Sequence, residues 1–154
     1  MTSMKKGEML NAILVAAVTG HSGQFDRGGN PYILHPIAVM NLLPPDACEE
    51  LRCIAIGHDL VEDTKMTYTE LAAMGMSPRV IDGIKRLTKI PGESYDEYME
   101  RVKGSEDSMI VKMADLKHNT DITRLKGVTE KDMTRTARYF SFYVELKHAL
   151  EGKK

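Results

Sequence analysis

Ile54-Ala-Ile-Gly-His-Asp-Leu-Val-Glu-Asp63 is the stretch that decides how this chain is interpreted. If it is helical, His58 and Glu62 lie four residues apart, as do Asp59 and Asp63, so an imidazole and three carboxylates occupy neighbouring faces. Burying several like charges is costly unless a cation or protons neutralise them. A divalent metal bound by imidazole nitrogen and carboxylate oxygen would do so. Taken alone, a solvated acidic helix end explains the stretch slightly better.

Two further segments supply residues of the same chemical kind. His35 stands directly before Pro36, where a turn at the start of a helix can hold it, although a lone histidine in that setting is more often structural. Asp115 follows an apolar run, with Lys112 and Asn119 three and four residues away, so helical geometry groups the three near one face. By itself this pattern also fits an ordinary amphipathic helix. The three segments together are much more specific than any one of them.

Apolar residues recur at helical spacing along almost the whole chain, and no stretch shows the alternation of a strand. Helix starts are indicated by polar-x-x-acid capping boxes and by a Ser-Pro pair. These signals are Asp46–Glu49, Thr67–Glu70, Ser77-Pro78, Ser94–Glu97 and Thr129–Asp132. The predicted helices are 5–19, 35–43, 46–61, 67–74, 77–89, 94–103, 106–122 and 129–150, with a glycine-rich break at 20–34. The sequence therefore predicts one all-α domain over residues 1–154, closed by the helix at 129–150.

Composition excludes several classes of function. The 154 residues are 42% hydrophobic and 28% charged, as in ordinary globular proteins. The net charge of −1, from 21 basic and 22 acidic residues, gives no global attraction for a nucleic-acid polymer, whereas a nucleotide needs only a local basic patch. The apolar run at residues 12–18 is too short to span a bilayer, so we expect a cytoplasmic protein without a leader or a membrane partner. Cys48 and Cys53 are expected to be reduced.

The order of these motifs resembles the HD superfamily, and within it the hydrolase domain of the RelA/SpoT alarmone enzymes, over residues 10–125. The motifs that carry the resemblance are His21-Ser-Gly-Gln24, Pro31-Tyr-Ile-Leu-His-Pro36, His58-Asp-Leu-Val-Glu-Asp-Thr64, Asp82-Gly83, Lys112-Met-Ala-Asp115 and His118-Asn119. The resemblance implies an HD-type helical bundle with a divalent metal, usually manganese, held by His35, His58, Asp59 and Asp115. It also implies that Glu62 and Asp63 position or activate the attacking water, and that Asn119 contacts the nucleotide.

The expected substrate-recognition residues depart from the family pattern. Asp26 stands where the family favours arginine, and two cations usually found after the second metal aspartate are missing or moved around Asp121. Arg27 is the nearest cation to the first gap, and Lys117 and Arg124 could partly fill the second. The predicted substrate-binding residues are Arg27, Tyr32, Lys112 and Asn119. Reversing a charge beside a phosphate can redirect specificity.

The predicted function is metal-dependent hydrolysis of a nucleotide phosphate ester or anhydride, with the 3′-pyrophosphate of ppGpp as the first choice. The alternatives are an HD nucleotidase or pyrophosphohydrolase acting on another nucleotide, and a nucleotide-binding module without catalysis. We expect the structural frame around the metal ligands to include His21, Gln24 and His118. We expect His148 to lie at the surface. Aromatic residues within 139–143 fit a core or a homo-oligomer seam better than base stacking. The oligomeric state stays open.

Overall fold

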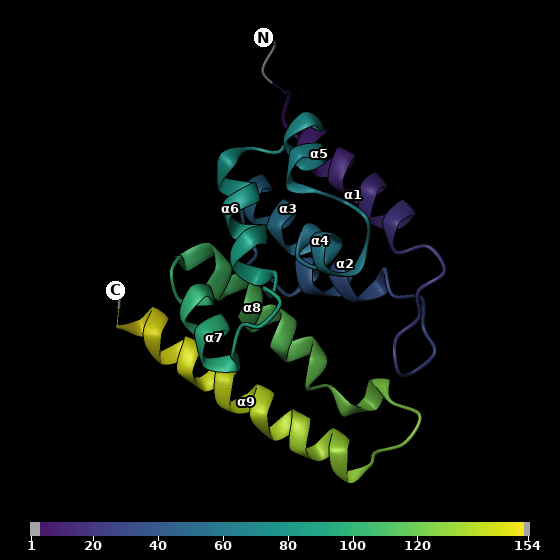
Figure 1. Cartoon of the computed structure of the whole chain (residues 1–154), viewed down its shortest axis with the longest axis vertical. Coiled ribbons are helices and arrows are strands. Elements are labelled where there is room, and N and C mark those ends of the chain that lie inside the picture. The colour runs from purple at the N-terminus through teal and green to yellow at the C-terminus, as the bar shows by residue number, and fades with distance from the viewer. Residues whose placement is uncertain (1–3, 153–154) are drawn as a thin grey trace.

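Helix α3 (Glu49–Gly57) runs through the middle of the molecule, and the other helices are arranged around it (Figure 1). The computed structural model describes residues 4–152. Six of the nine residues of α3 are buried, because α1, α2, α6 and α8 all pack against it. The predicted all-α fold is confirmed: within residues 4–152 the extended structure is limited to one isolated bridge between Phe25 and Pro31.

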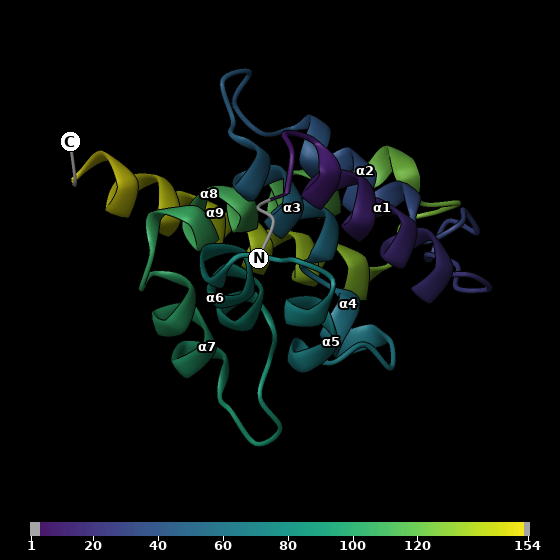
Figure 2. The ribbon, with the colours of Figure 1, turned by 90° about the horizontal axis from the view of Figure 1, so that it is seen from above.

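The remaining helices follow in chain order. They are α1 (Glu8–Gly20), α2 (Leu34–Asn41), α4 (Leu60–Asp63), α5 (Tyr68–Ala73), α6 (Pro78–Leu87), α7 (Tyr95–Val102), α8 (Glu106–Asn119), a 3-10 turn (Ile122–Arg124) and α9 (Glu130–Glu151). Helix α9 lies along α8 at one edge of the molecule (Figure 1), and the view from above shows α6 and α7 on the side opposite α1 and α2 (Figure 2). No helix among the described residues is both long and apolar enough to cross a membrane.

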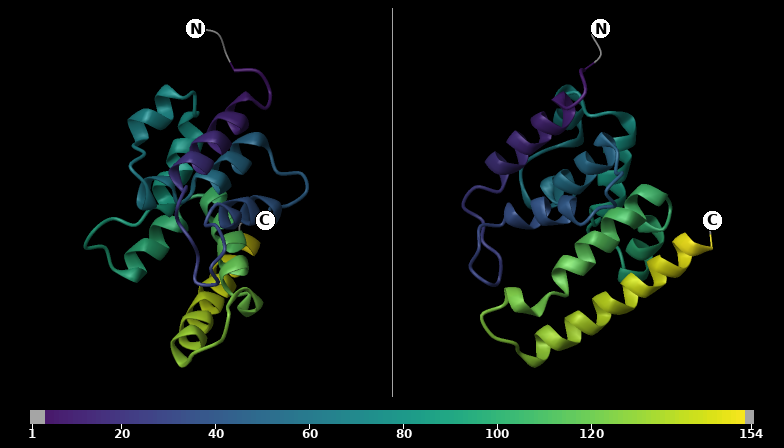
Figure 3. Two further views of the ribbon diagram at one scale, coloured as in Figure 1. Left: turned by 90° about the vertical axis from the view of Figure 1, so that its right-hand side faces the viewer. Right: turned by 180° about the vertical axis from the view of Figure 1, so that it is seen from behind.

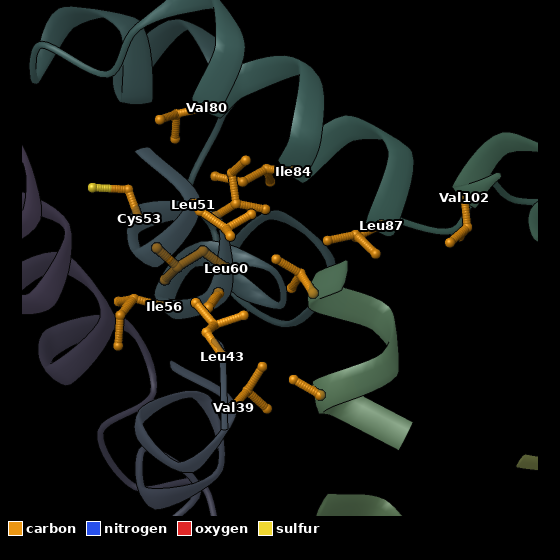
Figure 4. Packing of buried hydrophobic residues seen from close by; sticks show 14 of the residues in the cluster. Val39, Leu43, Leu51, Cys53, Ile56, Leu60, Val80, Ile84, Leu87 and Val102 are labelled. Atoms are coloured by element: carbon orange, nitrogen blue, oxygen red, sulfur yellow. The ribbon is translucent and has the colours of Figure 1, made fainter. Parts of the chain in front are cut away.

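The core depends on two close approaches between helices. A Cβ atom on Gly57 would lie 2.6 Å from Cδ1 of Ile13 in α1 and 2.8 Å from Cδ1 of Ile84 in α6. A Cβ on Gly83 would lie 2.5 Å from Cδ1 of Ile54. Figure 4 shows Ile84 and Leu60 among the buried side chains around α3. Glycine at these positions lets α1 and α6 close on α3 immediately before His58, which fixes the start of the candidate site.

Several predicted helix starts are confirmed by their side-chain caps. The hydroxyl groups of Thr67, Ser77, Ser94 and Thr129 each accept a hydrogen bond from the backbone N–H of the third residue of their helix, and Thr129 with Asp132 forms a complete capping box. The capping box predicted at Asp46 is wrong, since α3 begins at Glu49 and its N-cap residue makes no side-chain cap.

Two predicted helices are interrupted where the site lies. The helix predicted at 46–61 is interrupted at His58 and Asp59: α3 ends at Gly57, and helical structure resumes at Leu60 as the short helix α4. The helix predicted at 106–122 ends at Asn119, and the Asp121 side chain caps the separate 3-10 turn by accepting from the N–H of Thr123. The other predicted helices differ from the observed ones only by a few residues at their ends.

Candidate metal centre and adjoining pocket

The four predicted metal ligands meet at the centre of the molecule. His35 comes from α2, His58 and Asp59 from the turn between α3 and α4, and Asp115 from α8. Nε2 of His35 lies 2.8 Å from Oδ1 of Asp115, and Nε2 of His58 lies 3.1 Å from Oδ2 of Asp59 and 3.3 Å from Oδ1 of Asp115. Two imidazole nitrogens and two carboxylate oxygens therefore point at one another in a buried position.

His58 has an orientation that suits a metal ligand. Its Nδ1 lies 2.6 Å from the carbonyl oxygen of Ala55, so that nitrogen carries the proton and donates it. Its Nε2 is buried and has no hydrogen-bond partner among residues 4–152, although two carboxylate oxygens are close. Burial opposes the imidazolium form, but Asp59 and Asp115 raise the pKa of His58 well above its ordinary value. A divalent cation fits this set of donors, since it would satisfy the buried nitrogen and both carboxylates at once.

His118 stands behind His35. The two Nδ1 atoms are 2.7 Å apart, and the rings stack at 20° with centroids 5.0 Å apart. Burial, followed by the nearby charge of Arg124, lowers the pKa of His118 to about 4, so its neutral ring can accept the proton that His35 donates from Nδ1. This arrangement directs Nε2 of His35 into the central cluster. A hydrogen bond to the second ring nitrogen is the usual way in which a neighbouring residue orients a histidine that binds a metal.

Asp59 receives a hydrogen bond from Tyr32. The Tyr32 hydroxyl donates to Oδ2 of Asp59 at 2.6 Å. Burial opposes ionisation of the carboxyl group, yet the charge of His58 holds the pKa of Asp59 down at about 2. Asp59 is therefore an ionised carboxylate, and the hydrogen bond from Tyr32 fixes its orientation.

His21 and Gln24 form a frame beside the cluster. Nδ1 of His21 lies 2.8 Å from Oε1 of Gln24, and the Gln24 amide donates to the carbonyl oxygen of Asp63 at 2.8 Å. The His21 ring also packs against Tyr32, with centroids 5.0 Å apart. These bonds join the end of α1 to the end of α4.

Glu62 and Asp63 lie next to the cluster on α4. Carboxylate atoms of Asp59, Glu62 and Asp63 lie within 4.8 Å of one another. Oε1 of Glu62 accepts from the backbone N–H of Lys89 at 2.9 Å, which ties α4 to the loop after α6. Partial burial and then the charges of Asp59 and Glu62 raise the pKa of Asp63 to about 6. A carboxylate with such a pKa is suited to accept a proton near neutral pH.

Asn119 and Lys112 both contact Asp115, but on different oxygens. The Asn119 amide donates to Oδ1 at 3.1 Å, and the Lys112 ammonium lies 2.8 Å from Oδ2. Asn119 also lines the pocket described next, whereas Lys112 does not. The role predicted for Lys112 in substrate binding stays a prediction. Within the fold, the Lys112 ammonium contacts Asp115 and not the pocket.

A pocket of about 270 Å³ opens from the cluster toward the loops at 25–30 and 120–128. His35, Tyr32 and Asn119 line its inner end. Its outer part is lined by the cations Arg27, Arg124 and Arg135, together with Asp26, Asp121 and Tyr139. The pocket thus joins the cluster of metal-type ligands to a group of guanidinium side chains, which suits a phosphorylated ligand.

The cations of the pocket are partly neutralised. Arg124 pairs with Asp26 at 3.2 Å. Asp132 lies 3.6 Å from Arg27 and 2.5 Å from Arg135. Carboxylates therefore contact all three guanidinium groups, so an anionic ligand would compete with Asp26 and Asp132 for them.

Two candidate residues of the pocket escaped the sequence analysis. Arg135 and Tyr139 lie one turn apart on the inner side of α9, and both line the pocket. Their spacing of four residues was the available signal, but Tyr139 had been grouped with the apolar residues that follow it. Of those, Phe142 is buried and Phe140 is exposed. Lys117 lines a different groove, between residues 42–45 and α9.

The two loops at the mouth of the pocket lie near each other (Figure 3), and a hydrogen bond between their side chains joins them. Arg124 reaches across to Asp26, and a Cβ atom on Gly28 would collide with the carbonyl oxygen of Arg124. Glycine at position 28 is therefore required for this approach. One wall of the pocket consists of segments that are distant in sequence.

Comparisons with known proteins confirm the predicted resemblance to the alarmone hydrolases, while no family model matches the chain. The chain is 29% identical over 143 residues to the guanosine-3′,5′-bis(diphosphate) 3′-pyrophosphohydrolase of Haemophilus influenzae, covering 84% of this chain and 21% of that protein. It is 28% identical over 121 residues to the bifunctional (p)ppGpp synthase/hydrolase SpoT of Escherichia coli, covering 71% and 17% respectively. The chain thus spans about a fifth or less of the length of these curated relatives.

A solved structure has the same fold. It belongs to a protein described as a metazoan ortholog of SpoT that hydrolyses ppGpp. The TM-score is 0.74 at 21% sequence identity, and the match covers 94% of this chain and 88% of that one. The helical arrangement predicted from the sequence is therefore that of a known all-α fold.

Proposed function

We propose that this chain is a metal-dependent phosphohydrolase that removes the 3′-pyrophosphate of ppGpp. The observation that carries the proposal is the Nε2 atom of His58. This atom is buried, has no hydrogen-bond partner among the described residues, and lies beside the atoms of His35, Asp59 and Asp115 that could bind a metal. A polar atom left in this state costs free energy unless a ligand satisfies it. A divalent cation bound there, for which manganese is our choice, would lower the pKa of a bound water and screen phosphate charge.

In this proposal some side chains around the cluster orient the metal ligands and others take part in proton transfer. Tyr32 and His118 hold the ligands Asp59 and His35 in direction through hydrogen bonds. In this proposal Asp63 accepts a proton from the attacking water, which its pKa of about 6 supports, and Glu62 beside it is tied to the loop after α6. These contacts orient Asp59, His35 and Glu62 in the absence of substrate.

The pocket supports a nucleotide as the substrate. Arg27, Arg124 and Arg135 offer planar donors for phosphate oxygens, and Tyr139 offers an aromatic face in the same pocket. Asn119 joins the pocket to the cluster, because its amide contacts Asp115. Curated relatives with ppGpp hydrolase activity make ppGpp the first nucleotide to test.

A different nucleotide is the second candidate, and the ion pairs of the pocket favour it. Asp26 pairs with Arg124, and Asp132 pairs with both Arg27 and Arg135. Each guanidinium group is therefore already partly neutralised before a highly charged ligand binds. A nucleotide with fewer phosphates would need fewer of these pairs to open. A binding module without catalysis is the third candidate, but it would have no use for Glu62 and Asp63.

The test is hydrolysis by metal-free protein to which manganese, magnesium or buffer is added, with ppGpp and a panel of other nucleotides. We expect manganese-stimulated release of pyrophosphate and GDP from ppGpp. Turnover of another nucleotide with none of ppGpp would reject this substrate and keep the chemistry. Binding of nucleotides without turnover of any would favour the binding module.

The matched variants exchange adjacent acids for their amides at two places. Glu62→Gln with Asp63→Asn should lower kcat by at least about a hundredfold, since general acid–base groups contribute about that much or more. Asp96→Asn with Glu97→Gln alters an exposed acidic pair on α7 and should leave kcat unchanged. Full activity in the first double variant would show that the water is activated by other groups.

A further inference from the structure

Lys112 places a positive charge inside the protein, one turn before Asp115 on α8. Its side chain is 14% exposed, and its ammonium nitrogen lies 2.8 Å from Oδ2 of Asp115. A buried charge of this kind persists only when it is paired.

Two aromatic rings enclose the Lys112 ammonium. Its nitrogen lies 5.3 Å from the ring centre of Tyr98 on α7 and 6.0 Å from that of Phe142 on α9. Both rings are fixed, because the Tyr98 hydroxyl donates to the carbonyl oxygen of Leu87 at 3.1 Å and Phe142 is buried. Cation–π attraction strengthens as the cation loses water. Three helices therefore hold this ammonium in one place.

The enclosed ammonium divides the two oxygens of Asp115 between different partners. Oδ2 faces Lys112, and Oδ1 faces His35 at 2.8 Å and Asn119 at 3.1 Å. Turning the carboxylate about its bond to Cβ would break the ion pair with a buried cation. Asp115 is thus held with a single oxygen directed at the two imidazoles.

We propose that Lys112 is a positioning residue that holds Asp115 as a one-oxygen ligand of the metal centre and does not contact the substrate. The inference rests on the metal centre of the proposed function, and it differs from the substrate-binding role that the sequence suggested for Lys112. It also gives α7 and α9 a part in the centre, since Tyr98 and Phe142 keep the ammonium against Asp115.

The experiment compares Lys112→Met with Lys85→Met in the 154-residue chain loaded with Co²⁺. Lys85 is the matched control because its ammonium also lies over a tyrosine ring, 5.1 Å from the centre of Tyr68, yet it contacts none of the candidate ligands. Visible absorption of the bound Co²⁺ reports the ligand geometry without any turnover. We expect Lys112→Met to change the position or intensity of the bands and Lys85→Met to leave the wild-type spectrum.

Kinetics with manganese and ppGpp separate positioning from substrate contact. We expect Lys112→Met to lower kcat by about 10- to 100-fold, the usual effect of losing a residue that orients a metal ligand, with KM within about twofold of wild type. A KM raised by about tenfold or more with an unchanged Co²⁺ spectrum would overturn the proposal in favour of a substrate contact. Unchanged spectrum and unchanged kcat would overturn it as well.

Two further variants guard against misfolding. Lys112→Gln keeps a hydrogen-bond donor without the charge, and Phe142→Leu removes one ring while keeping an apolar side chain. Both should shift the Co²⁺ spectrum in the same direction as Lys112→Met and by less; wild-type spectra in both would reject the role of Lys112. If wild-type protein does not hydrolyse ppGpp but the spectra shift as expected, the proposed substrate fails and the positioning role stands.

Discussion

Replacing Gly57 by alanine tests how tightly α3 is held between α1 and α6. The added Cβ would lie 2.6 Å from Cδ1 of Ile13 and 2.8 Å from Cδ1 of Ile84, both far inside normal contact distance. Overpacking a core by one methyl group costs about 1–3 kcal/mol, and replacing a helical glycine by alanine returns about 0.5–1 kcal/mol. Taking the middle of each range, we expect the free energy of unfolding to fall by about 1.2 kcal/mol, which lowers the melting temperature by roughly 2.5–5 °C for a chain of this size.

The assay is urea unfolding of the metal-free protein, with Gly127→Ala as the control. A Cβ on Gly127 meets no atom within 4 Å among the described residues, so that change should stay within about 0.5 kcal/mol of wild type. Ile13→Val removes the nearer of the two methyl groups and by itself costs about 0.5–1.5 kcal/mol. Combined with Gly57→Ala it should cost less than the sum, by at least about 0.5 kcal/mol. Additive losses, or a Gly57→Ala protein as stable as wild type, would refute the packing argument.

Two further predictions concern single side chains. A thiol reagent at about pH 8 should modify exposed Cys48 at once and Cys53 only in urea, because burial and then Glu49 raise the pKa of Cys53 to about 12; rapid labelling of both thiols would contradict this. Hydrogen bonds from Thr129 and Arg135 hold the pKa of Asp132 at about 2, so its stabilising effect is complete above about pH 4 and is lost as the pH falls toward 2. Acid unfolding of Asp132→Asn should accordingly be less steep there than that of wild type or of an exposed control, Asp96→Asn.

The fold could be predicted because its signals are local. Helical periodicity and the caps at Thr67, Ser77, Ser94 and Thr129 are properties of a few neighbouring residues, and the structure has helices beginning there. The break after Gly57 could not be predicted in this way. His58 and Asp59 directly follow the apolar helical pattern of α3 and carry no local helix-stop signal, whereas the packing of α2 and α8 against α3 at this point is a tertiary property.

The central cluster was predicted from motif order, and the pocket only in part: the predicted substrate-binding residues Arg27, Tyr32 and Asn119 line it, but its ion pairs and the contribution of α9 were not predicted. His35, His58, Asp59 and Asp115 lie together as expected. This could be predicted because each residue stands in a short motif with a recognisable composition. The ion pairs of Arg124 with Asp26 and of Arg135 with Asp132 depend on how loops and α9 fold back, which spacing does not reveal. The place of Lys112 under two aromatic rings is likewise a tertiary property.

The contact between Asp26 and Arg124 joins residues separated by 98 positions, and α9 contributes Arg135 and Tyr139 to the same pocket. A chain emerging from the ribosome at about 5–20 residues per second would therefore make α1 to α3 several seconds before the last wall of the pocket exists. The nascent protein therefore has its first helices, including α3, while it still lacks a complete pocket for a nucleotide. Binding of a nucleotide to arrested chains of increasing length would thus appear only once α9 has left the exit tunnel.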